Sequence, residues 1–420
     1  MDFLQFRRAG EGKNPRYAHC PAGFGVVQYI RTNEPLPFFI GNGIILSEEQ
    51  MDFTKHKPVR IYTGENCLSA HPEEFRAAGR RAMIVTGAHG ADACGAVADI
   101  IAALEAAGCT YIRFNRIPEN PPAPLCHEAG RIAVEEGCDF IVAAGGGSAL
   151  DAGKAVAGYA ANPDCGPDDI FDDAKRVNPC LPVIAVPTTA GTGSEAVRYS
   201  VLTIDGGARK KTFKHVSAYP RASFVDPRYT WTLSDKYTVS TALDALAHAV
   251  ESYLSPKSCP VSEEAALYAG REIWDILFRQ NKSSGWTKED RRRLSLAACA
   301  AGIAIDYTGT GFPHPLGYSL TLTRGIPHGE ACALFEGAFL CYNRLTDTGS
   351  IRIDTLADTL GTTPEEMIER IPEKSGVTLR IDPEEREALI DRVSGAGNYA
   401  NSPYVISRGE MSDIYKRLFG

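Results

Sequence analysis

The stretch of sequence that decides the fold reads DFIVAAGGGSALDAGKAVAGYA, at residues 139–160. Its opening at 139–148 predicts a buried strand that runs into a glycine turn, and the remainder predicts a helix that starts at Ser148. Because the three glycines at 145–147 have no Cβ atoms, backbone N–H groups in this turn can approach phosphate oxygens, and the helix N-terminus adds positive potential. The pattern therefore favours a phosphate-binding loop, with a plain tight turn as the alternative.

Strands and helices alternate regularly around this stretch. We expect strands at residues 59–64, 81–87, 110–115 and 181–189, and amphipathic helices at 96–108 and 125–137. Alternation of this kind predicts a parallel sheet covered by helices, with ligands bound beyond the carboxyl ends of the strands.

A second small-polar loop, PTTAGTGSE at residues 187–195, follows another buried strand. It offers the hydroxyls of Thr188, Thr189 and Thr192 beside flexible glycines. Two such loops at neighbouring strand ends would line one crevice for the pyrophosphate and nicotinamide riboside of a dinucleotide. The alternative is a threonine-rich turn before a helix capped by Ser194. The ordinary G-x-G-x-x-G fingerprint is absent, because leucine takes the place of its last glycine.

The predicted secondary structure changes near residue 228, from alternating strands and helices to helices alone. Helical periodicity follows at 239–254, 262–280, 290–305 and 330–345, and S/T/D-x-x-E helix starts recur at 363–374 and 382–394. We therefore expect two domains, an α/β dinucleotide-binding domain at 53–228 and an all-helical domain at 229–420. An N-terminal extension of unknown role at 1–52, with one strand-like run at 38–46, precedes them.

The run DALAHAVES, at residues 244–252, places a carboxylate and an imidazole on one face of a helix, because Asp244 and His248 are four residues apart. The later run HPLGYSLTLTRGIPH adds His314 and His328. One carboxylate and three imidazoles suit Fe(II), Zn(II) or Mn(II) and can leave a position open for substrate. A single buried histidine is more often an ordinary core residue, so the prediction of a metal site rests on the combination.

Composition and charge exclude several classes of protein. The net charge of -8 at pH 7 argues against binding to nucleic acid or to an anionic membrane. No apolar run approaches the length of about 20 residues needed to cross a bilayer, and the first residues lack the apolar stretch of a signal peptide. The 12 cysteines are scattered without a C-x-x-C pair, so we interpret them as buried reduced thiols. We therefore expect a cytoplasmic protein.

Four motifs in a fixed order resemble the iron-containing, group III alcohol dehydrogenase family. They are GGGSALDAGKA, PTTAGTGSE, DALAHAVES and a pair of histidines separated by 13 residues and followed by glycine, and the resemblance runs from about residue 57 to the last motif. It implies a Rossmann-like parallel-sheet dinucleotide domain followed by an all-helical metal-binding domain, with the active site between them. It also implies the metal ligands Asp244, His248, His314 and His328, and the cofactor-binding positions Gly145, Gly146, Gly147, Ser148, Asp151, Thr188, Thr189 and Thr192, with Lys210 or Lys211 as a lysine on the cofactor side.

The sequence departs from the family pattern at three places. Many relatives carry a second histidine four residues after the third ligand, where this chain has Tyr318, whose hydroxyl would partly replace it as a catalytic orienting or proton-relay group. NAD-preferring relatives place an aspartate after the early strand, where this chain has Gly87 at the cofactor. A carboxylate there would repel a 2′-phosphate and glycine would not, so we lean to NADP over NAD. The first fifty or so residues match nothing obvious in the family.

The resemblance implies a metal-dependent alcohol dehydrogenase or aldehyde reductase, which transfers hydride between NAD(P)(H) and a small alcohol or aldehyde, with Fe(II) or Zn(II) as Lewis acid and a homodimer as the assembly. The first alternative is a polyol(-phosphate) dehydrogenase or a dehydroquinate synthase-like lyase on the same scaffold. Those enzymes would need further Lys or Arg side chains near His314–His328, where the sequence offers only Arg324. The second alternative is a non-enzymatic binding or scaffold protein.

Overall fold

Six parallel β-strands form the main sheet of the protein, in a computed structural model that describes residues 53, 58–283 and 285–420. In spatial order they are β1 (Arg60–Thr63), β8 (Ala222–Val225), β5 (Val183–Pro187), β4 (Phe140–Gly145), β2 (Arg81–Thr86) and β3 (Thr110–Phe114). Each neighbouring pair runs parallel, so the expected parallel sheet is confirmed. The N-terminal extension at 1–52, with its strand-like run at 38–46, lies outside the described residues.

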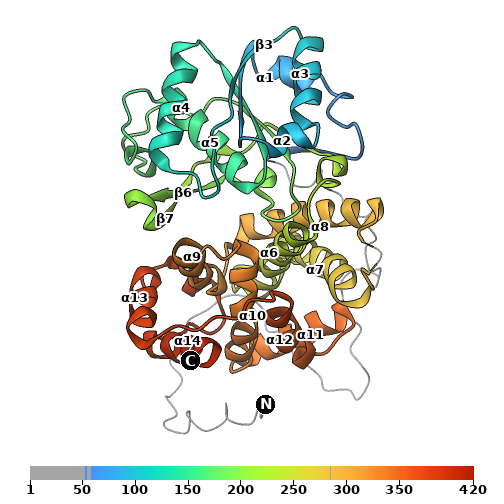
Figure 1. Cartoon of the computed structure of the whole chain (residues 1–420), viewed down its shortest axis with the longest axis vertical. Helices are drawn as coiled ribbons and strands as arrows, with labels where there is room; N and C mark the ends of the chain where they lie inside the picture. The colour runs from blue at the N-terminus through green and yellow to red at the C-terminus, as the bar shows by residue number, and fades with distance from the viewer. Residues whose placement is uncertain (1–52, 54–57, 284) are drawn as a thin grey trace, which may run out of the picture. The chain divides into compact units, whose positions relative to one another are not determined.

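Helices cover both faces of this sheet (Figure 1). They are α1 (Glu73–Ala78), α2 (Gly90–Ala93), α3 (Ala96–Ala106), α4 (Ala123–Glu135) and α5 (Gly147–Ala161). Successive side chains of a strand point to opposite faces, and β4 accordingly serves two cores. Ile141 and Ala143 pack with residues of α4 and α5, whereas Val142 packs with residues of α1 and α3. Burial on both faces explains why the central strands are apolar throughout and easy to recognise in the sequence.

Three strands were missed by the sequence analysis. Strands β6 (Tyr199–Ile204) and β7 (Arg209–Lys214) form an antiparallel hairpin beside the main sheet, and β8 lies inside that sheet. The sequence of β7, RKKTFK, is mostly charged and largely exposed, so it lacks the apolar alternation that identifies a half-buried strand. This hairpin carries Lys210, one of the two lysines expected on the cofactor side.

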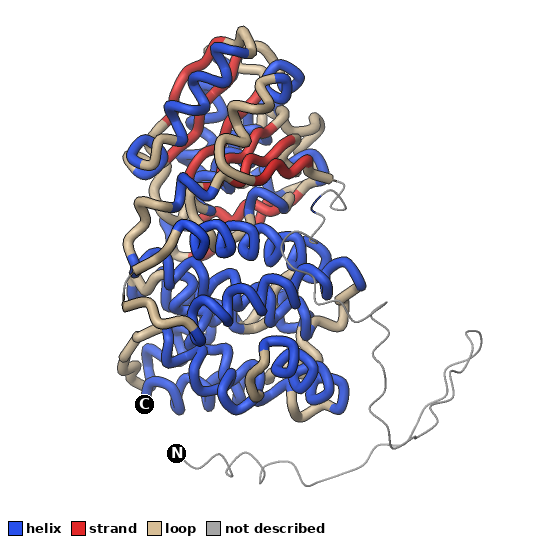
Figure 2. The backbone as a smooth tube through the Cα atoms, turned by 90° about the vertical axis from the view of Figure 1, so that its right-hand side faces the viewer, coloured by secondary structure: helices blue, strands red, loops and turns tan. Residues whose placement is uncertain are grey.

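The second half of the chain is helical, and Figure 2 shows the strands confined to one part of the described chain. Its helices are α6 (Asp235–Leu254), α7 (Pro260–Trp274), α8 (Lys288–Thr308), α9 (Pro313–Arg324), α10 (His328–Asn343), α11 (Asp347–Leu360), α12 (Pro364–Lys374), α13 (Pro383–Val393) and α14 (Arg408–Phe419). The α/β architecture followed by a helical one is therefore confirmed. None of the helices in the described ranges is long and apolar enough to span a bilayer.

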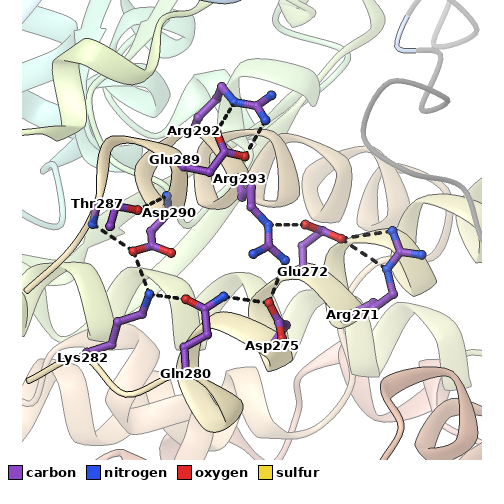
Figure 3. A network of polar contacts seen from close by, with 10 residues as sticks. All are labelled: Arg271, Glu272, Asp275, Gln280, Lys282, Thr287, Glu289, Asp290, Arg292 and Arg293. Carbon is purple, nitrogen blue, oxygen red and sulfur yellow. Dashed lines mark hydrogen bonds and ion pairs between the residues drawn. The ribbon is translucent and has the colours of Figure 1, made fainter.

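Helix α8 is the long helix against which both halves of the protein pack. Its sequence supplies a capping box, in which Thr287 and Asp290 each bond the other's backbone N–H. Figure 3 shows that Arg293 of α8 reaches Glu272 and Asp275 at the end of α7. Farther along, Asp306 accepts a hydrogen bond of 2.6 Å from Tyr219, which follows the hairpin in the α/β half. The Tyr219–Asp306 hydrogen bond thus joins α8 to the α/β half of the chain.

Candidate metal centre

Helix α6 holds two of the expected metal ligands on one face. Its start is fixed by Ser234, whose hydroxyl accepts the Tyr237 N–H as an N-cap. Four residues separate Asp244 from His248, which places the Nε2 atom of His248 3.8 Å from the Oδ1 atom of Asp244. The alanines that surround them are buried, and their small side chains leave the two polar groups side by side.

The other two expected ligands come from the first turns of α9 and α10. His314 follows Pro313 in the first turn of α9, and His328 follows Pro327 as the first residue of α10. Proline suits position 313 because its fixed φ angle is compatible with the first helical turn and its missing N–H would be unpaired there, whereas Pro327 precedes α10 as its N-cap residue. Both imidazoles approach the same carboxylate oxygen, since the Nε2 atoms of His314 and His328 lie 3.7 Å and 3.6 Å from Asp244 Oδ1.

These separations fit a metal ion. Metal–ligand bonds of about 2.0–2.2 Å in tetrahedral geometry place neighbouring O and N ligand atoms roughly 3.3–3.6 Å apart. Asp244 Oδ1 and His314 Nε2 are both buried and have no hydrogen-bond partner among the described residues. Leaving buried polar atoms unpaired costs about 1–3 kcal/mol each. A cation at their centre would satisfy both atoms, so the residues present suit the group that the sequence pattern implies.

Gly329 allows α10 to come close enough to α6 for this geometry. A Cβ atom built on Gly329 would lie 1.8 Å from the backbone oxygen of Ser240 and 2.8 Å from the backbone nitrogen of Asp244. No side chain fits in that space. The neighbouring His328 therefore reaches Asp244 only because the next residue is glycine.

A buried glutamate orients His314. The Oε1 atom of Glu251 lies 2.6 Å from His314 Nδ1, and its Oε2 atom accepts the backbone N–H of Gly311. Burial opposes the charged form of His314, but the Glu251 and Asp244 carboxylates outweigh it and raise the pKa of His314. A carboxylate on Nδ1 favours the tautomer whose Nε2 lone pair faces the ligand cluster, as is common behind metal-bound histidines.

The remaining imidazoles are held in the form that binds metals. Burial is the main cause that lowers the pKa of His248 and of His328, so both are neutral near pH 7. Solvent reaches the cluster from one side, because the side chain of His328 is 25% exposed, whereas those of His248 and His314 are only 6% and 2% exposed. A substrate would therefore approach beside His328.

Glu336, on α10 behind Glu251, should weaken the fold as the pH rises. Burial and then the Glu251 carboxylate raise the pKa of Glu336 well above its ordinary 4.5, so the folded protein keeps a proton that the unfolded chain releases. Stability is therefore lost from about pH 4.5 up to the folded pKa, by up to about 1.4 kcal/mol per pH unit. Glu336→Gln should raise the melting temperature at neutral pH and leave it unchanged near pH 4.

Thermal unfolding of both proteins across this pH range measures the effect. Glu369→Gln, at an exposed position of α12, is the control for loss of one carboxyl group. Parallel stability profiles for Glu336→Gln and the wild type would contradict the prediction.

Tyr318 and Lys210 lie at the exposed side of the cluster. The Tyr318 ring stacks on His328 with 5.1 Å between ring centroids, and Lys210 Nζ lies 4.5 Å from the centre of the Tyr318 ring. Burial is the main cause that raises the pKa of Tyr318, so its hydroxyl remains a proton donor. The neighbouring Lys211 instead lies over Phe171, so of the two candidate lysines only Lys210 is near the expected metal ligands. Arg324 points elsewhere, into an ion pair with Glu385.

The two small-polar loops lie against each other, as expected for neighbouring strand ends. Strands β4 and β5 are paired so that Gly145 faces Pro187, and the Thr188 N–H donates to the Gly145 carbonyl at 2.9 Å. A Cβ atom on Gly147 would lie 2.4 Å from Thr192 Cγ2, and one on Gly146 would lie 3.3 Å from Thr189. The glycines are thus required for the packing of the two loops against each other. Gly87 follows β2, the other neighbour of β4.

Two residues expected at the cofactor make hydrogen bonds within the protein. Asp151 accepts hydrogen bonds from the Ser194 hydroxyl at 2.5 Å and from the Val201 N–H at 2.7 Å. Ser148 accepts one from the Asn120 N–H at 3.1 Å. The buried Lys154 also binds Ser194, at 2.6 Å. The contacts of Asp151 and Lys154 tie helix α5 to the second loop and to strand β6.

Sequence reasoning missed one member of the cluster, Cys332. Asp244, His314, His328 and Cys332 each offer a ligand atom, and these atoms all lie within 4.8 Å of one another. His248 approaches Asp244 and stacks on His314, but it is not part of this compact group. The signal was present, since His328 and Cys332 are four residues apart at the start of a helix. The scatter of the other cysteines concealed it.

Two family models match the chain. The model described as iron-containing alcohol dehydrogenase matches residues 58–227, and the model described as Fe-containing alcohol dehydrogenase family, C-terminal, matches residues 238–419.

Curated proteins and solved structures agree with this match. "Probable alcohol dehydrogenase EutG" of Salmonella typhimurium is 36% identical over 213 residues. These residues are 50% of this chain and 53% of that protein, so the chain spans about half the length of this relative. The 1,3-propanediol dehydrogenase of Citrobacter freundii is 32% identical over 68% of this chain and 74% of that protein. The crystal structure of an iron-containing alcohol dehydrogenase from Thermotoga maritima has a TM-score of 0.79 at 33% identity, over 86% of this chain and 98% of that one.

Proposed function

Because this chain belongs to the iron-containing alcohol dehydrogenase family, we propose that it interconverts a small alcohol and its aldehyde by hydride exchange with NAD(P)(H). The observation that carries the proposal is the position of one carboxylate oxygen, Asp244 Oδ1, within 3.6–3.8 Å of three imidazole nitrogens. The named relatives are alcohol and diol dehydrogenases, so the dehydroquinate synthase-like alternative is not favoured.

Asp244, His248, His314 and His328 are the proposed metal ligands. When bound there, Fe(II) or Zn(II) would supply a Lewis acid for the substrate oxygen. Glu251 holds His314 in the orientation that this requires. Tyr318 lies on the side from which substrate would enter, and we assign its hydroxyl to donate a hydrogen bond to the substrate oxygen.

The glycine turn and the threonine loop are the proposed dinucleotide site. Helix α5 begins at Gly147 without a side-chain cap, so its first N–H groups face outward from the helix start. A diphosphate would accept hydrogen bonds from them and benefit from the positive end of the helix. Asp151 and Ser148 act by holding these loops, given their internal contacts. NAD(P)(H) would supply the hydride carrier.

A turnover assay with defined metal content tests the proposed function. Protein purified without oxygen is stripped with a chelator, reloaded with Fe(II) or Zn(II), and mixed with NADH or NADPH and a panel of short aldehydes. We expect nicotinamide absorbance to fall only in the reloaded samples, with roughly one ion bound per chain. Full metal loading without turnover on any aldehyde or alcohol would refute the proposed activity.

We also propose a preference for NADP over NAD, because Gly87 puts no carboxylate near the end of β2. Gly87→Asp should lower the NADPH preference about tenfold or more, since like charges about 4 Å apart repel by roughly 1–4 kcal/mol. A Cβ atom there would lie 3.2 Å from the Ile117 backbone oxygen, so the change needs a small shift of the backbone at Ile117. Gly397→Asp adds the same charge at an exposed site of the helical half.

The measurement is the ratio of kcat/KM for NADPH to that for NADH. An unchanged ratio in Gly87→Asp, equal to that in the control, would remove the argument for NADP.

We also make proposals about the assembly, the cellular location and the domain boundaries of the protein. We propose a homodimer in the cytoplasm, with the α/β domain at 53–228 and the helical domain at 229–420. Strand β8 ends at Val225 and helix α6 begins at Asp235, which supports a boundary in this interval. Light scattering during size-exclusion chromatography measures the assembly, and a monomer at micromolar concentration would rule out the dimer.

A further inference from the structure

Lys154 lies in the middle of helix α5 with its ammonium group fully buried beside the threonine loop. Its side chain has no exposed surface, although lysine is rarely buried to this degree without partners. Its Nζ atom donates hydrogen bonds to the Ser194 hydroxyl at 2.6 Å and to the Tyr199 carbonyl at 2.7 Å. From these contacts we propose that Lys154 is a positioning residue for the dinucleotide, which holds the threonine loop and the β6–β7 hairpin in the arrangement that binds it.

The position of Lys154 keeps its amine away from the cofactor itself. Helix α5 begins at Gly147, so Lys154 lies roughly 10 Å along the helix from the N–H groups that would bind a diphosphate. Both hydrogen bonds of its amine end on protein atoms, and its side chain is closed to solvent. Its effect on the cofactor therefore passes through the residues that it holds.

The Ser194 hydroxyl is the link between Lys154 and the threonine loop. It accepts the hydrogen bond from Lys154 and donates its own to Asp151 Oδ1 at 2.5 Å. Because Lys154 and Asp151 carry opposite charges, with Nζ and Oδ1 3.7 Å apart, both bonds of the hydroxyl are charge-assisted. The Ser194 N–H in turn donates to Thr192 Oγ1 at 3.2 Å. The place of Ser194 thus sets that of Thr192, one of the residues expected at the cofactor.

The other hydrogen bond of Lys154 reaches the hairpin that carries Lys210. Tyr199 is the first residue of β6, whose antiparallel partner β7 contains Lys210. Asp151 holds the same strand, because its Oδ2 atom accepts the Val201 N–H at 2.7 Å. One buried ammonium group thus connects helix α5, the threonine loop and the hairpin, and these three elements carry residues expected on the cofactor side.

Loss of Lys154 should loosen these elements without disturbing the metal centre. The carboxylates that act on the Lys154 charge are those of Asp151, Glu195 and Asp306, and none of them is an expected metal ligand. Cofactor affinity should therefore fall while metal affinity stays constant, a difference that a general loss of stability would not produce. The inference rests on the proposed function, because it assumes the dinucleotide site described above.

Direct titration with NADPH and with NADH tests the inference without measuring turnover. Dissociation constants from nicotinamide fluorescence, Co(II) affinity and the melting temperature are measured for the wild type, Lys154→Met and Tyr159→Phe. Tyr159→Phe is the matched control, because it deletes another hydrogen bond of α5, from the Tyr159 hydroxyl to the Pro167 carbonyl at 2.5 Å. We expect Lys154→Met to weaken cofactor binding about tenfold or more, since it removes two charge-assisted hydrogen bonds. Tyr159→Phe should lower only the melting temperature, and both variants should bind Co(II) as the wild type does.

The outcomes separate this inference from the proposed function. Cofactor binding by Lys154→Met that equals that of the wild type, or that of a weakened Tyr159→Phe, overturns the inference and leaves the dinucleotide site intact. A matching loss of Co(II) affinity in Lys154→Met also overturns it. A wild type that binds neither NADPH nor NADH overturns both.

A second variant decides the question should Lys154→Met not fold. Ser194→Ala cuts the link to the threonine loop and keeps the charges of Lys154 and Asp151. Weaker cofactor binding with unchanged Co(II) affinity in this variant supports the inference, and unchanged cofactor binding refutes it.

Discussion

Asp244→Ala should abolish metal binding and reduce kcat/KM by about a thousandfold or more. Asp244 Oδ1 is the atom that all three imidazoles approach, so its loss removes the centre of the cluster and its anionic ligand. Lewis-acid stabilisation of a developing oxyanion contributes several kcal/mol, and each 1.4 kcal/mol is roughly a factor of ten in rate. The measurements are bound metal by elemental analysis and steady-state turnover with NADPH.

Stability provides a second readout for the same variant. Binding of an ion to the folded state raises the melting temperature of the wild type, and this rise should vanish in Asp244→Ala. Without metal the variant should lose no hydrogen bond through Oδ1, which has no hydrogen-bond partner among the described residues. Asp358→Ala, at an exposed position of α11, should bind metal normally. Full metal occupancy in Asp244→Ala would contradict the ligand assignment.

The features that depend on local sequence were predicted well. Strand β4, the glycine turn and helix α5 follow from an apolar run, three glycines and a small-residue helix, and the structure has them in that order. Asp244 and His248 share a face because helix geometry alone brings residues four apart together. Strand β7 was missed, since its charged sequence carries no apolar period.

The features that depend on tertiary packing were not accessible from spacing. Asp244 and His328 are far apart in the chain, and their approach depends on how α10 packs on α6. Lys210 reaches Tyr318 from a hairpin that the sequence analysis did not contain. Cys332 was grouped with the buried thiols, because a cysteine in an apolar helix has the same pattern whether it faces a core or an ion.

Packing at Gly329 gives the second large expected effect. Gly329→Ala should destabilise the protein by more than about 1–3 kcal/mol and weaken metal binding at least tenfold. Alanine is the better helix former by about 1 kcal/mol, so propensity alone predicts the opposite sign. The new Cβ atom would lie 1.8 Å from the Ser240 oxygen, which is backbone in the middle of α6 and cannot rotate away. Helix α10 must shift, as overpacking of a tight contact requires, and His328 moves with it.

The same substitution at Gly270 provides the matched comparison. Gly270 is a buried glycine inside α7, where a Cβ atom would lie 3.5 Å from Leu360 Cδ1, an ordinary contact distance. Gly270→Ala should therefore stabilise the fold by roughly 0.5–1 kcal/mol and leave metal affinity unchanged. Denaturant unfolding and cobalt titration of the two variants measure both quantities. Equal behaviour of Gly329→Ala and Gly270→Ala would mean that the close approach of α10 to α6 does not position His328.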